Sequence, residues 1–337
     1  MRLSRSSFVV LVTTGLCAVV GPRAGGAAPP SNEPVPVEIP AGLRARVPML
    51  EMSGLAWSAS LDRYLVVIDD SVDEDEGTRH GPFVLALGRD GKVDSEPVPV
   101  VGVDAIDDAE SIVAGPDDTF FLLTSHSPNR RGKIHKSRCQ LLALKLDKRK
   151  LVVTGAINLL HGHHDLVEEL VALGLPASTT VDLEGLGYHD GTLYIGCKAP
   201  LLANGSALIL RIDRLAEAFA RGRLRKRSLS AWGEVKLSVP SPDGGPVSEG
   251  IADLFFAGDG ALYLCANSPK AAAGKDGGGT LWRVADQQGG QMKAQMVHRF
   301  SKLKPEGVTA APDGKSLTLV FDRDRLDPFW MKLPLGH

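Results

Sequence analysis

The segment DLEGLGYHDGTLYIGCKAP, residues 182–200, contains two β-patterned runs on either side of the dipeptide Asp190-Gly191. Asp-Gly between two such runs is the strongest short-range signal for a β-hairpin, because both central residues of a type I′ turn need a positive φ. The segment therefore predicts two antiparallel strands joined by a two-residue turn.

Four further segments have the same organisation, and five related units predict a repeat architecture. Each unit begins with an anchor residue, and the anchors are Ser53, Glu110, Glu184, Glu249 and Glu306. Successive anchors are separated by 57, 74, 65 and 57 residues. The sequence after each hairpin supplies further strands, so each unit is expected to form an antiparallel sheet of four strands. Sheets of this kind repeated around an axis form a β-propeller.

The sequence predicts an all-β fold with five blades. Six blades are the alternative, because roughly 310 mature residues also divide into six units of about 50. The fifth unit supplies only three strands before the chain ends, whereas residues 34–47 contain an unassigned strand. We therefore expect an N-terminal strand to close the last blade. Helical spacing of apolar residues predicts two inserted helices, within residues 161–175 and 214–228.

Composition and the N-terminus define the class of protein. The chain has 337 residues, of which 43% are hydrophobic and 23% charged, and its 37 glycines and 22 prolines indicate many tight turns. Residues 1–27 combine Arg2 and Arg5 with a short apolar run and then small residues, which is the layout of a signal peptide. We expect one propeller domain over residues 28–337, exported to the periplasm or the extracellular space, with no membrane span.

The charge balance argues against a nucleic-acid partner. Residues 1–27 contain three arginines and no acids, so the formal charge changes from 38 − 40 = −2 to 35 − 40 = −5 on cleavage. A nucleic-acid-binding domain is typically basic.

Three cysteines remain after cleavage, and an odd number cannot form a complete disulfide framework. We expect a monomer whose partner is a small anionic ligand or an envelope protein.

The units resemble bacterial propellers of the phytase-like and SdiA-regulated type. The stretch SHSPNRRGK at residues 125–133 and the stretch from Asp182 to Leu210 carry most of this resemblance. It implies a propeller fold and export. Related propellers include calcium-dependent hydrolases and lactonases, in which a glutamate at a strand start helps to hold the ion, but fold analogy alone does not assign an activity.

Ten positions are expected to converge at one mouth of the channel, since the first strand of a blade starts where the second ends. The strand starts are the five anchors, and the strand ends are Asp69, His126, Lys198, Asn267 and Asp322. Carboxylate and amide oxygens are the ligands that Ca²⁺ prefers. The predicted metal ligands are Glu110, Glu184, Glu249, Glu306, Asn267, Asp69 and Asp322, with Asp108 and Asp182 as further acids nearby. The alternative is a hydrated polar channel without an ion.

The same face suggests a reaction. Glu184 and His126 are the candidate catalytic residues, with one of them acting as general base on a metal-held water in the hydrolysis of a phosphate or other ester. Lys198, Arg130, Arg131 and Lys133 are candidate ligands for an anion. The alternative function is a non-catalytic propeller that binds a ligand or a protein in the cell envelope.

Overall fold

The structure, a computed structural model, describes residues 33–47, 50–69, 82–129, 131–159, 166–176, 180–225, 227–240, 245–268, 278–323 and 326–335. The predicted signal peptide lies outside these ranges. None of the helices within them has the length and apolar character that a membrane crossing requires.

The strands fall into five antiparallel sets once the eight-stranded sheet is divided at the parallel pair that joins its two halves. Each set contains one of the five sequence units. The first set is β2 (Met52–Ser58), β3 (Arg63–Ile68), β4 (Phe83–Leu87) and β5 (Val98–Val101), and the second is β6 (Ala109–Ala114), β7 (Thr119–Thr124), β8 (Gln140–Asp147) and β9 (Lys150–Asn158). The third is β10 (Asp182–His189), β11 (Thr192–Ala199), β12 (Ala207–Ile212) and β13 (Leu229–Val235), and the fourth is β16 (Gly250–Phe256), β17 (Leu262–Asn267), β18 (Gly279–Val284) and β20 (Ala294–Phe300). The fifth is β21 (Lys304–Ala310), β22 (Ser316–Asp322), β23 (Phe329–Pro334) and β1 (Val35–Pro36).

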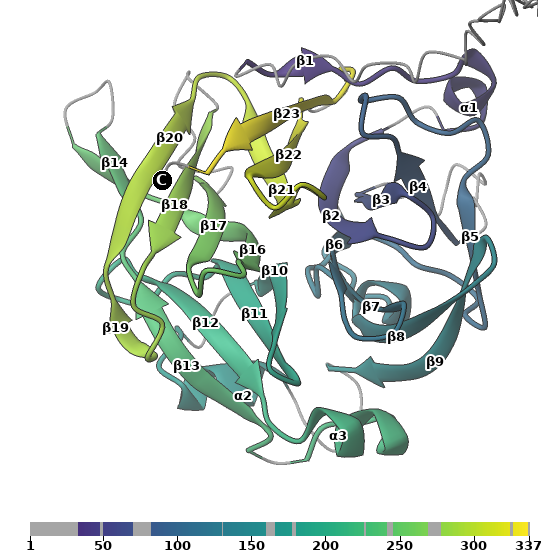
Figure 1. Cartoon of the computed structure of the whole chain (residues 1–337). Coiled ribbons are helices and arrows are strands. Elements are labelled where there is room, and N and C mark those ends of the chain that lie inside the picture. Colours follow the sequence, from purple (N-terminus) through teal and green to yellow (C-terminus); the bar gives the residue numbers. More distant parts are fainter. Residues whose placement is uncertain are drawn as a thin grey trace, which may run out of the picture.

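The remaining elements are short and lie between or outside these sets. They are β14 (Ser238–Pro240), β15 (Pro246–Ser248), β19 (Gly290–Met292), α1 (Ala41–Arg46), α2 (Leu166–Ala172), α3 (Leu215–Arg221) and a 3-10 turn at Lys136–Arg138. Both inserted helices predicted from the sequence are present as α2 and α3. They lie at the same edge of the molecule, beyond β9 and β13 (Figure 1).

The hairpin that decided the fold has the predicted turn. Asp190 and Gly191 have φ values of 46° and 77°, and His189 pairs with Thr192 on either side of them. Positive φ at both central residues is the requirement of a type I′ turn, whose twist matches that of the flanking strands. The local sequence therefore determines this hairpin.

The innermost strands form a closed ring. β2 contacts β6, β6 contacts β10, β10 contacts β16, β16 contacts β21, and β21 contacts β2 again (Figure 1). The parallel pair β5–β9 joins the outer strands of the first and second sets, and the parallel pair β13–β19 adds the short strand before β20 to the outer strand of the third set. The prediction of an all-β propeller is confirmed.

The N-terminal strand completes the last set, as predicted. Val35 of β1 pairs with Trp330 of β23, and the Val37 N–H donates to the Pro328 carbonyl at 2.9 Å. Leu43 of α1 is fully buried against the same core. This pairing covers the strand edge that β23 would otherwise expose.

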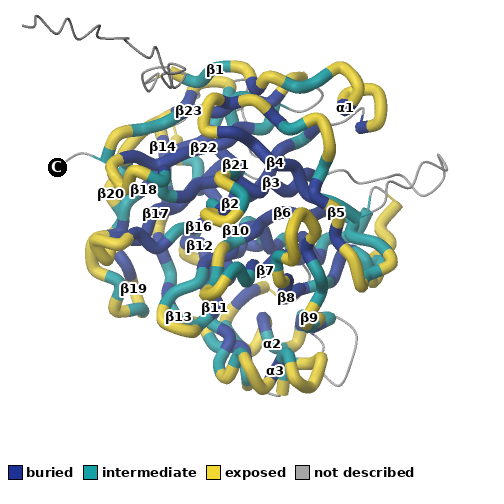
Figure 2. Tube along the Cα trace, turned by 45° about the vertical axis from the view of Figure 1, so that its right-hand side comes forward, coloured by how far each residue is buried: buried dark blue, intermediate teal, exposed yellow. Residues whose placement is uncertain are grey.

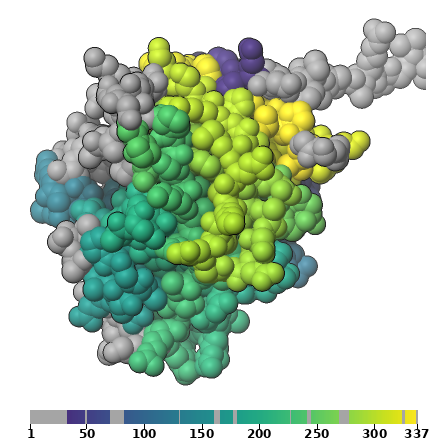
Figure 3. Space-filling model, turned by 90° about the vertical axis from the view of Figure 1, so that its left-hand side faces the viewer, coloured from purple at the N-terminus to yellow at the C-terminus, as the bar shows by residue number. Residues whose placement is uncertain are grey.

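The hydrophobic core lies between the sets. Five clusters of buried side chains each join two neighbouring sets, for example the cluster that contains Tyr194 of β11 and Leu264 of β17. Buried residues follow the inner strands, and exposed ones collect on the loops (Figure 2). The third and fourth sets lie side by side on the face of the molecule shown in Figure 3. Cys139, Cys197 and Cys265 are buried free thiols within these layers.

Candidate functional site

The inner strands carry a β-bulge near their starts, and the bulge positions the predicted glutamates. The pairing registers of β6, β10 and β21 shift at Glu110, Glu184 and Glu306. In β2 the shift falls between Met52 and Leu55. A bulge leaves its extra residue out of the ladder and re-aims its side chain. Three of the predicted strand-start glutamates therefore occupy equivalent places around the ring.

Glu249 does not belong to this group, contrary to the prediction. The bulge of the fourth set falls at Ala252, three residues later in the chain. Glu249 precedes β16 and accepts hydrogen bonds from the hydroxyl of Thr280 and from Nε1 of Trp282, the latter at 3.4 Å. Burial raises the pKa of this carboxyl to about 7. Glu249 is thus hydrogen-bonded within its own strand set, although Glu249-Gly250-Ile251 has the sequence of the other anchors.

At the ends of the second strands, one residue differs from the predicted set. In each set, the residue before the bulge has a pairing partner on the second strand. The residues that directly follow these partners in the chain are Asp69, Ser125, Lys198, Asn267 and Asp322. Ser125 takes the place that the sequence alignment assigned to His126. His126 has a φ of 60°, which turns its side chain away, and its Nδ1 lies 2.6 Å from the Thr124 carbonyl oxygen.

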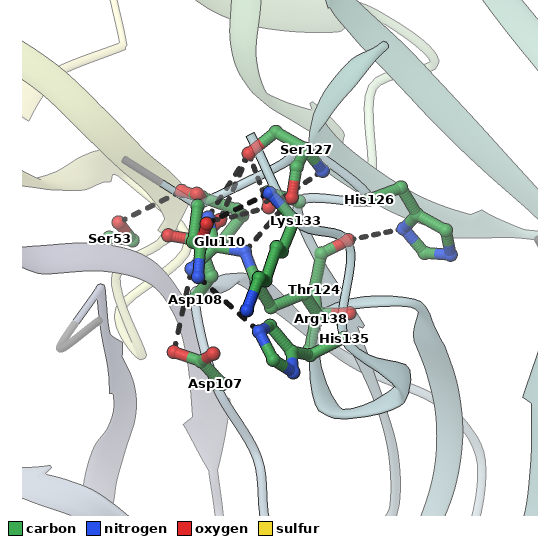
Figure 4. Close-up of polar contacts among 12 residues, drawn as sticks. Ser53, Asp107, Asp108, Glu110, Thr124, His126, Ser127, Lys133, His135 and Arg138 are labelled. Carbon is green, nitrogen blue, oxygen red and sulfur yellow. Dashed lines mark hydrogen bonds and ion pairs between the residues drawn. The ribbon is translucent and has the colours of Figure 1, made fainter. Parts of the chain in front are cut away.

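His126 is therefore not positioned to act at the mouth. Figure 4 shows its ring apart from Asp108 and Glu110. Only 1% of the residue is exposed, and burial lowers the pKa of the imidazole to about 4. Its position is better suited to packing than to proton transfer with a bound ligand.

Two groups of carboxylates meet at the mouth, and they share one residue. The first consists of Asp69, Asp108 and Glu110, and the second of Glu110, Asp182 and Glu184. Within each group, one oxygen per residue lies within 4.8 Å of the others. The three contributing strand sets are neighbours in the ring. Asp108 and Asp182, each two residues before a glutamate, join the site as their spacing along a strand predicts.

Asp108 is the carboxylate with the fullest set of partners. Arg138, only 4% exposed, donates through its guanidinium to Asp108, and the hydroxyls of Ser125 and Ser127 also donate to it. Burial raises the pKa of Asp108, but the hydrogen bond from Asp69 and the charge of Arg138 outweigh burial and leave the pKa below its usual value. Asp108 is therefore ionised at neutral pH.

The other acids of the two groups have the opposite tendency. Burial, together with neighbouring carboxylates, raises the pKa of Asp69 and of Glu110 well above the usual range. Burial also raises the pKa of Glu184, although Lys198 opposes the change. Like charges this close cannot all ionise unless positive charge is added. The site therefore favours either protons or a cation.

Lys198 links the third set to the fifth. Its Nζ lies 2.5 Å from Oε2 of Glu184 and 3.7 Å from Oε1 of Glu306, and Nδ2 of Asn267 donates to that same Oε1 at 3.0 Å. Oδ2 of Asp322 lies 3.7 Å from Nζ of a different lysine, Lys304. The second half of the predicted ring is thus a set of paired side chains.

Asp253, a buried residue that the sequence analysis missed, joins three strand sets inside the ring. Its Oδ1 accepts from Ser111 Oγ at 2.8 Å, and its Oδ2 accepts from the Val308 N–H at 2.8 Å. The side chain lies one residue after the bulge of its strand, where β2, β10 and β21 have Gly54, Gly185 and Gly307. An alignment based on the bulges rather than on Glu-Gly would have found it.

Residues 127–138 form a loop rich in lysine and arginine, here called the basic loop. It starts and ends at the acidic mouth, since Ser127 and Arg138 both contact Asp108. Oδ1 of Asn129 accepts from the backbone N–H groups of Arg131 and Lys133, each at 3.0 Å. Arg131 and Lys133 are exposed, whereas Arg130 lies outside the described residues. Arg138 is a counter-ion inside the fold and is not available to a ligand.

No protein-family model and no curated protein matches the sequence, so the resemblance to phytase-like and SdiA-regulated propellers has no further sequence support. Among solved structures, the chain is similar to the aldose sugar dehydrogenase of Escherichia coli at 12% identity and a TM-score of 0.47, covering 90% of this chain and 99% of that one. It is also similar to the glutaminyl cyclase of Myxococcus xanthus at 11% identity and a TM-score of 0.44, covering 90% and 94%. A gluconolactonase of Xanthomonas campestris has 13% identity and a TM-score of 0.39, covering 94% and 99%. The function is therefore argued from the site itself.

Proposed function

We propose that the mouth of this propeller binds a hard divalent cation, with Ca²⁺ as the first candidate, and through it a small anionic ligand. The observation that carries the proposal is the sharing of Glu110 by two carboxylate groups whose oxygens lie within 4.8 Å. Ca²⁺ is bound by carboxylate oxygens at about 2.3–2.6 Å, so only oxygens that lie no more than about 5 Å apart can contact the same ion. The oxygens of each group meet this requirement.

The electrostatics of the site support the same proposal. Glu110 is 7% exposed and is surrounded by acids from three strand sets. A divalent cation would take the place of the protons that these buried carboxyls otherwise need. Asp69, Asp108, Glu110, Asp182 and Glu184 are the residues that would hold the ion. The chemistry it would supply is the attraction of an anion and the polarisation of a bound oxygen.

The anion would approach from the side of the basic loop. Arg131 and Lys133 are exposed on a segment whose two ends are tied to Asp108. A small anion, such as a phosphate or a carboxylate, would contact the cation together with Arg131 and Lys133.

Binding without turnover is the function that we place first. His126, the candidate general base, is enclosed and turned to Thr124, and Glu184 is held by Lys198. Metal-assisted hydrolysis of a phosphate or other ester, with Glu110 or Glu184 as base, is the second candidate. Burial raises the pKa of both carboxyls above the usual range, which makes each a better proton acceptor than an ordinary glutamate.

The test is calorimetric titration of EDTA-treated protein with Ca²⁺, comparing the wild type with Glu110→Gln. We expect one equivalent of Ca²⁺ on the wild type and none on the variant, with folding retained in both. Glu96→Gln, which removes a charge at an exposed residue, is the matched control and should bind as the wild type does. Absence of binding by the wild type would overturn the proposal.

The same proteins distinguish the two candidate functions. Loaded with Ca²⁺, they are assayed against phosphomonoesters, carboxylic esters and lactones. Turnover that Glu110→Gln or Glu184→Gln abolishes would establish a hydrolase. Binding of inorganic phosphate that depends on Ca²⁺, without turnover, would establish the binding protein.

Export of the chain is part of the proposal. It rests on the charged, apolar and small-residue zones of residues 1–27. Expression of the full chain followed by fractionation and N-terminal sequencing should yield a protein that starts near Ala28 outside the cytoplasm. A product that retains Met1 in the cytoplasmic fraction would contradict it.

A further inference from the structure

The half of the mouth that faces the third and fifth strand sets has the composition of a second cation position. Glu184 comes from β10 and Glu306 from β21, and both residues are more than nine-tenths buried. Asn267 at the end of β17 orients Glu306 through the 3.0 Å hydrogen bond to Oε1. Three strand sets thus contribute oxygen-bearing side chains to one place, as they do around Glu110.

A positive charge already lies at this position, and it belongs to the protein. The ammonium of Lys198 is 2.5 Å from Oε2 of Glu184 and 3.7 Å from Oε1 of Glu306. Its side chain is only 14% exposed, so little of the charge is screened by solvent. An ammonium is a compact point charge with rotatable donors, which is the role that a small metal cation would otherwise have.

We infer that Lys198 is a built-in cation that occupies the second cation position of the mouth and thereby limits how many metal ions the site can hold. The inference rests on the proposed function, because it concerns the same acidic mouth. Glu184 belongs both to the carboxylate group around Glu110 and to the pair with Lys198. The lysine consequently determines which oxygens remain available to an added ion.

Removal of the ammonium should open this position. In Lys198→Met, Glu184 and Glu306 lose their counter-ion without a new donor taking its place. Two buried carboxylates beside a vacated position then favour the entry of another cation. We expect the variant to bind one more equivalent of Ca²⁺ than the wild type, and to melt at a lower temperature in EDTA but close to the wild type in excess Ca²⁺.

The experiment is equilibrium dialysis of EDTA-treated full-length protein against Ca²⁺, with thermal melting in parallel. Lys198→Met should gain one equivalent, and Lys198→Met with Glu184→Gln should lose that gain. Lys92→Met is the control for net charge, because Lys92 pairs with Glu38 on the exposed surface. It should bind as the wild type does.

The outcomes separate the inference from the proposed function. A wild type that binds no Ca²⁺ beside a Lys198→Met variant that binds one equivalent would overturn the proposed function and support the inference. Equal numbers of ions on the wild type and on Lys198→Met would overturn the inference, whatever the wild type binds. Should Lys198→Met fail to fold in EDTA, the same variant is refolded in excess Ca²⁺ and its bound ions are counted there. Failure to refold or to gain an ion under these conditions would also overturn the inference, because a filled position would stabilise the variant.

Discussion

Asp253 of β16 and Ser111 of β6 meet inside the ring of inner strands, with Ser111 Oγ 2.8 Å from Asp253 Oδ1. The other oxygen of Asp253 accepts the backbone N–H of Val308 in β21. One carboxyl from the fourth set thereby joins the second and fifth sets across the ring. These two hydrogen bonds hold the inner strands of three sets together inside the ring.

Loss of this carboxyl should destabilise the propeller strongly. Asp253→Ala leaves the Val308 N–H and the Ser111 hydroxyl buried without their acceptor. Each unsatisfied buried group costs about 1–3 kcal/mol. We expect a loss of about 3 kcal/mol in urea unfolding. Asp286→Ala, at an exposed residue, should change the free energy of unfolding by less than about 0.5 kcal/mol. Equal effects of the two substitutions would show that Asp253 has no such role.

The narrow ring also constrains its glycines. A Cβ added at Gly54 would lie 2.5 Å from the Cα of Ser111, whereas a Cβ added at Gly42 in α1 would have no heavy atom within 4 Å. Overpacking of a tight core costs about 1–3 kcal/mol, and alanine is the better helix former. Gly54→Ala should therefore lower the melting temperature, and Gly42→Ala should leave it unchanged or raise it. A harmless Gly54→Ala would mean that the inner strands can separate.

Stability should fall as the pH rises from about 4.5 to 7, in part because of Glu249. The pKa of this carboxyl is about 7 in the folded protein because of burial, and near its usual lower value in the unfolded chain. The folded state therefore binds more protons in this window, and its advantage decreases as the pH rises. The contribution is full below the unfolded pKa and is lost by about pH 7.

Glu249→Gln removes the titrating group but keeps an oxygen that can accept from Thr280 and Trp282. The slope of unfolding free energy against pH should become smaller by up to about 1.4 kcal/mol per pH unit. Denaturant unfolding at pH 4.5, 5.5, 6.5 and 7.5 measures the slope. An unchanged slope would assign the pH dependence to the carboxyls of the mouth instead.

The N-terminal segment should contribute as core and not as a loose extension. Leu43 is fully buried, whereas Leu326 is 61% exposed, so the same substitution can be compared at both places. Leu43→Ala should cost about 2–5 kcal/mol through lost burial and a cavity, and Leu326→Ala about 0.5 kcal/mol or less. Deletion of residues 34–47 should have a larger effect than either, since it also exposes the edge of β23. Melting curves that do not distinguish these variants would contradict the docking of α1.

The repeated hairpins were predictable from the sequence alone, because the residues that specify a tight turn are adjacent in the chain. Asp190-Gly191 specifies a turn with two positive φ values, and the runs on either side alternate as strands do. From this pattern follow the five units, the propeller and the closing strand at Val35. Glu110, Glu184 and Glu306 were identified at the starts of these units, and Lys198 at the end of the second strand of its unit.

The set of side chains that meet at the mouth depends on the strand pairing and was not predictable from the sequence. A shift of one or a few residues in a pairing register changes which side chain points to the channel, and the letters of the sequence do not show where a bulge falls. Thus Glu249 has the sequence of an anchor but Ala252 has the position, and Ser125 stands where His126 was expected. Two contacts join strand sets that are distant in the chain: Lys198 with Glu306, and Asp253 with the N–H of Val308. Such contacts exist only once the ring has closed.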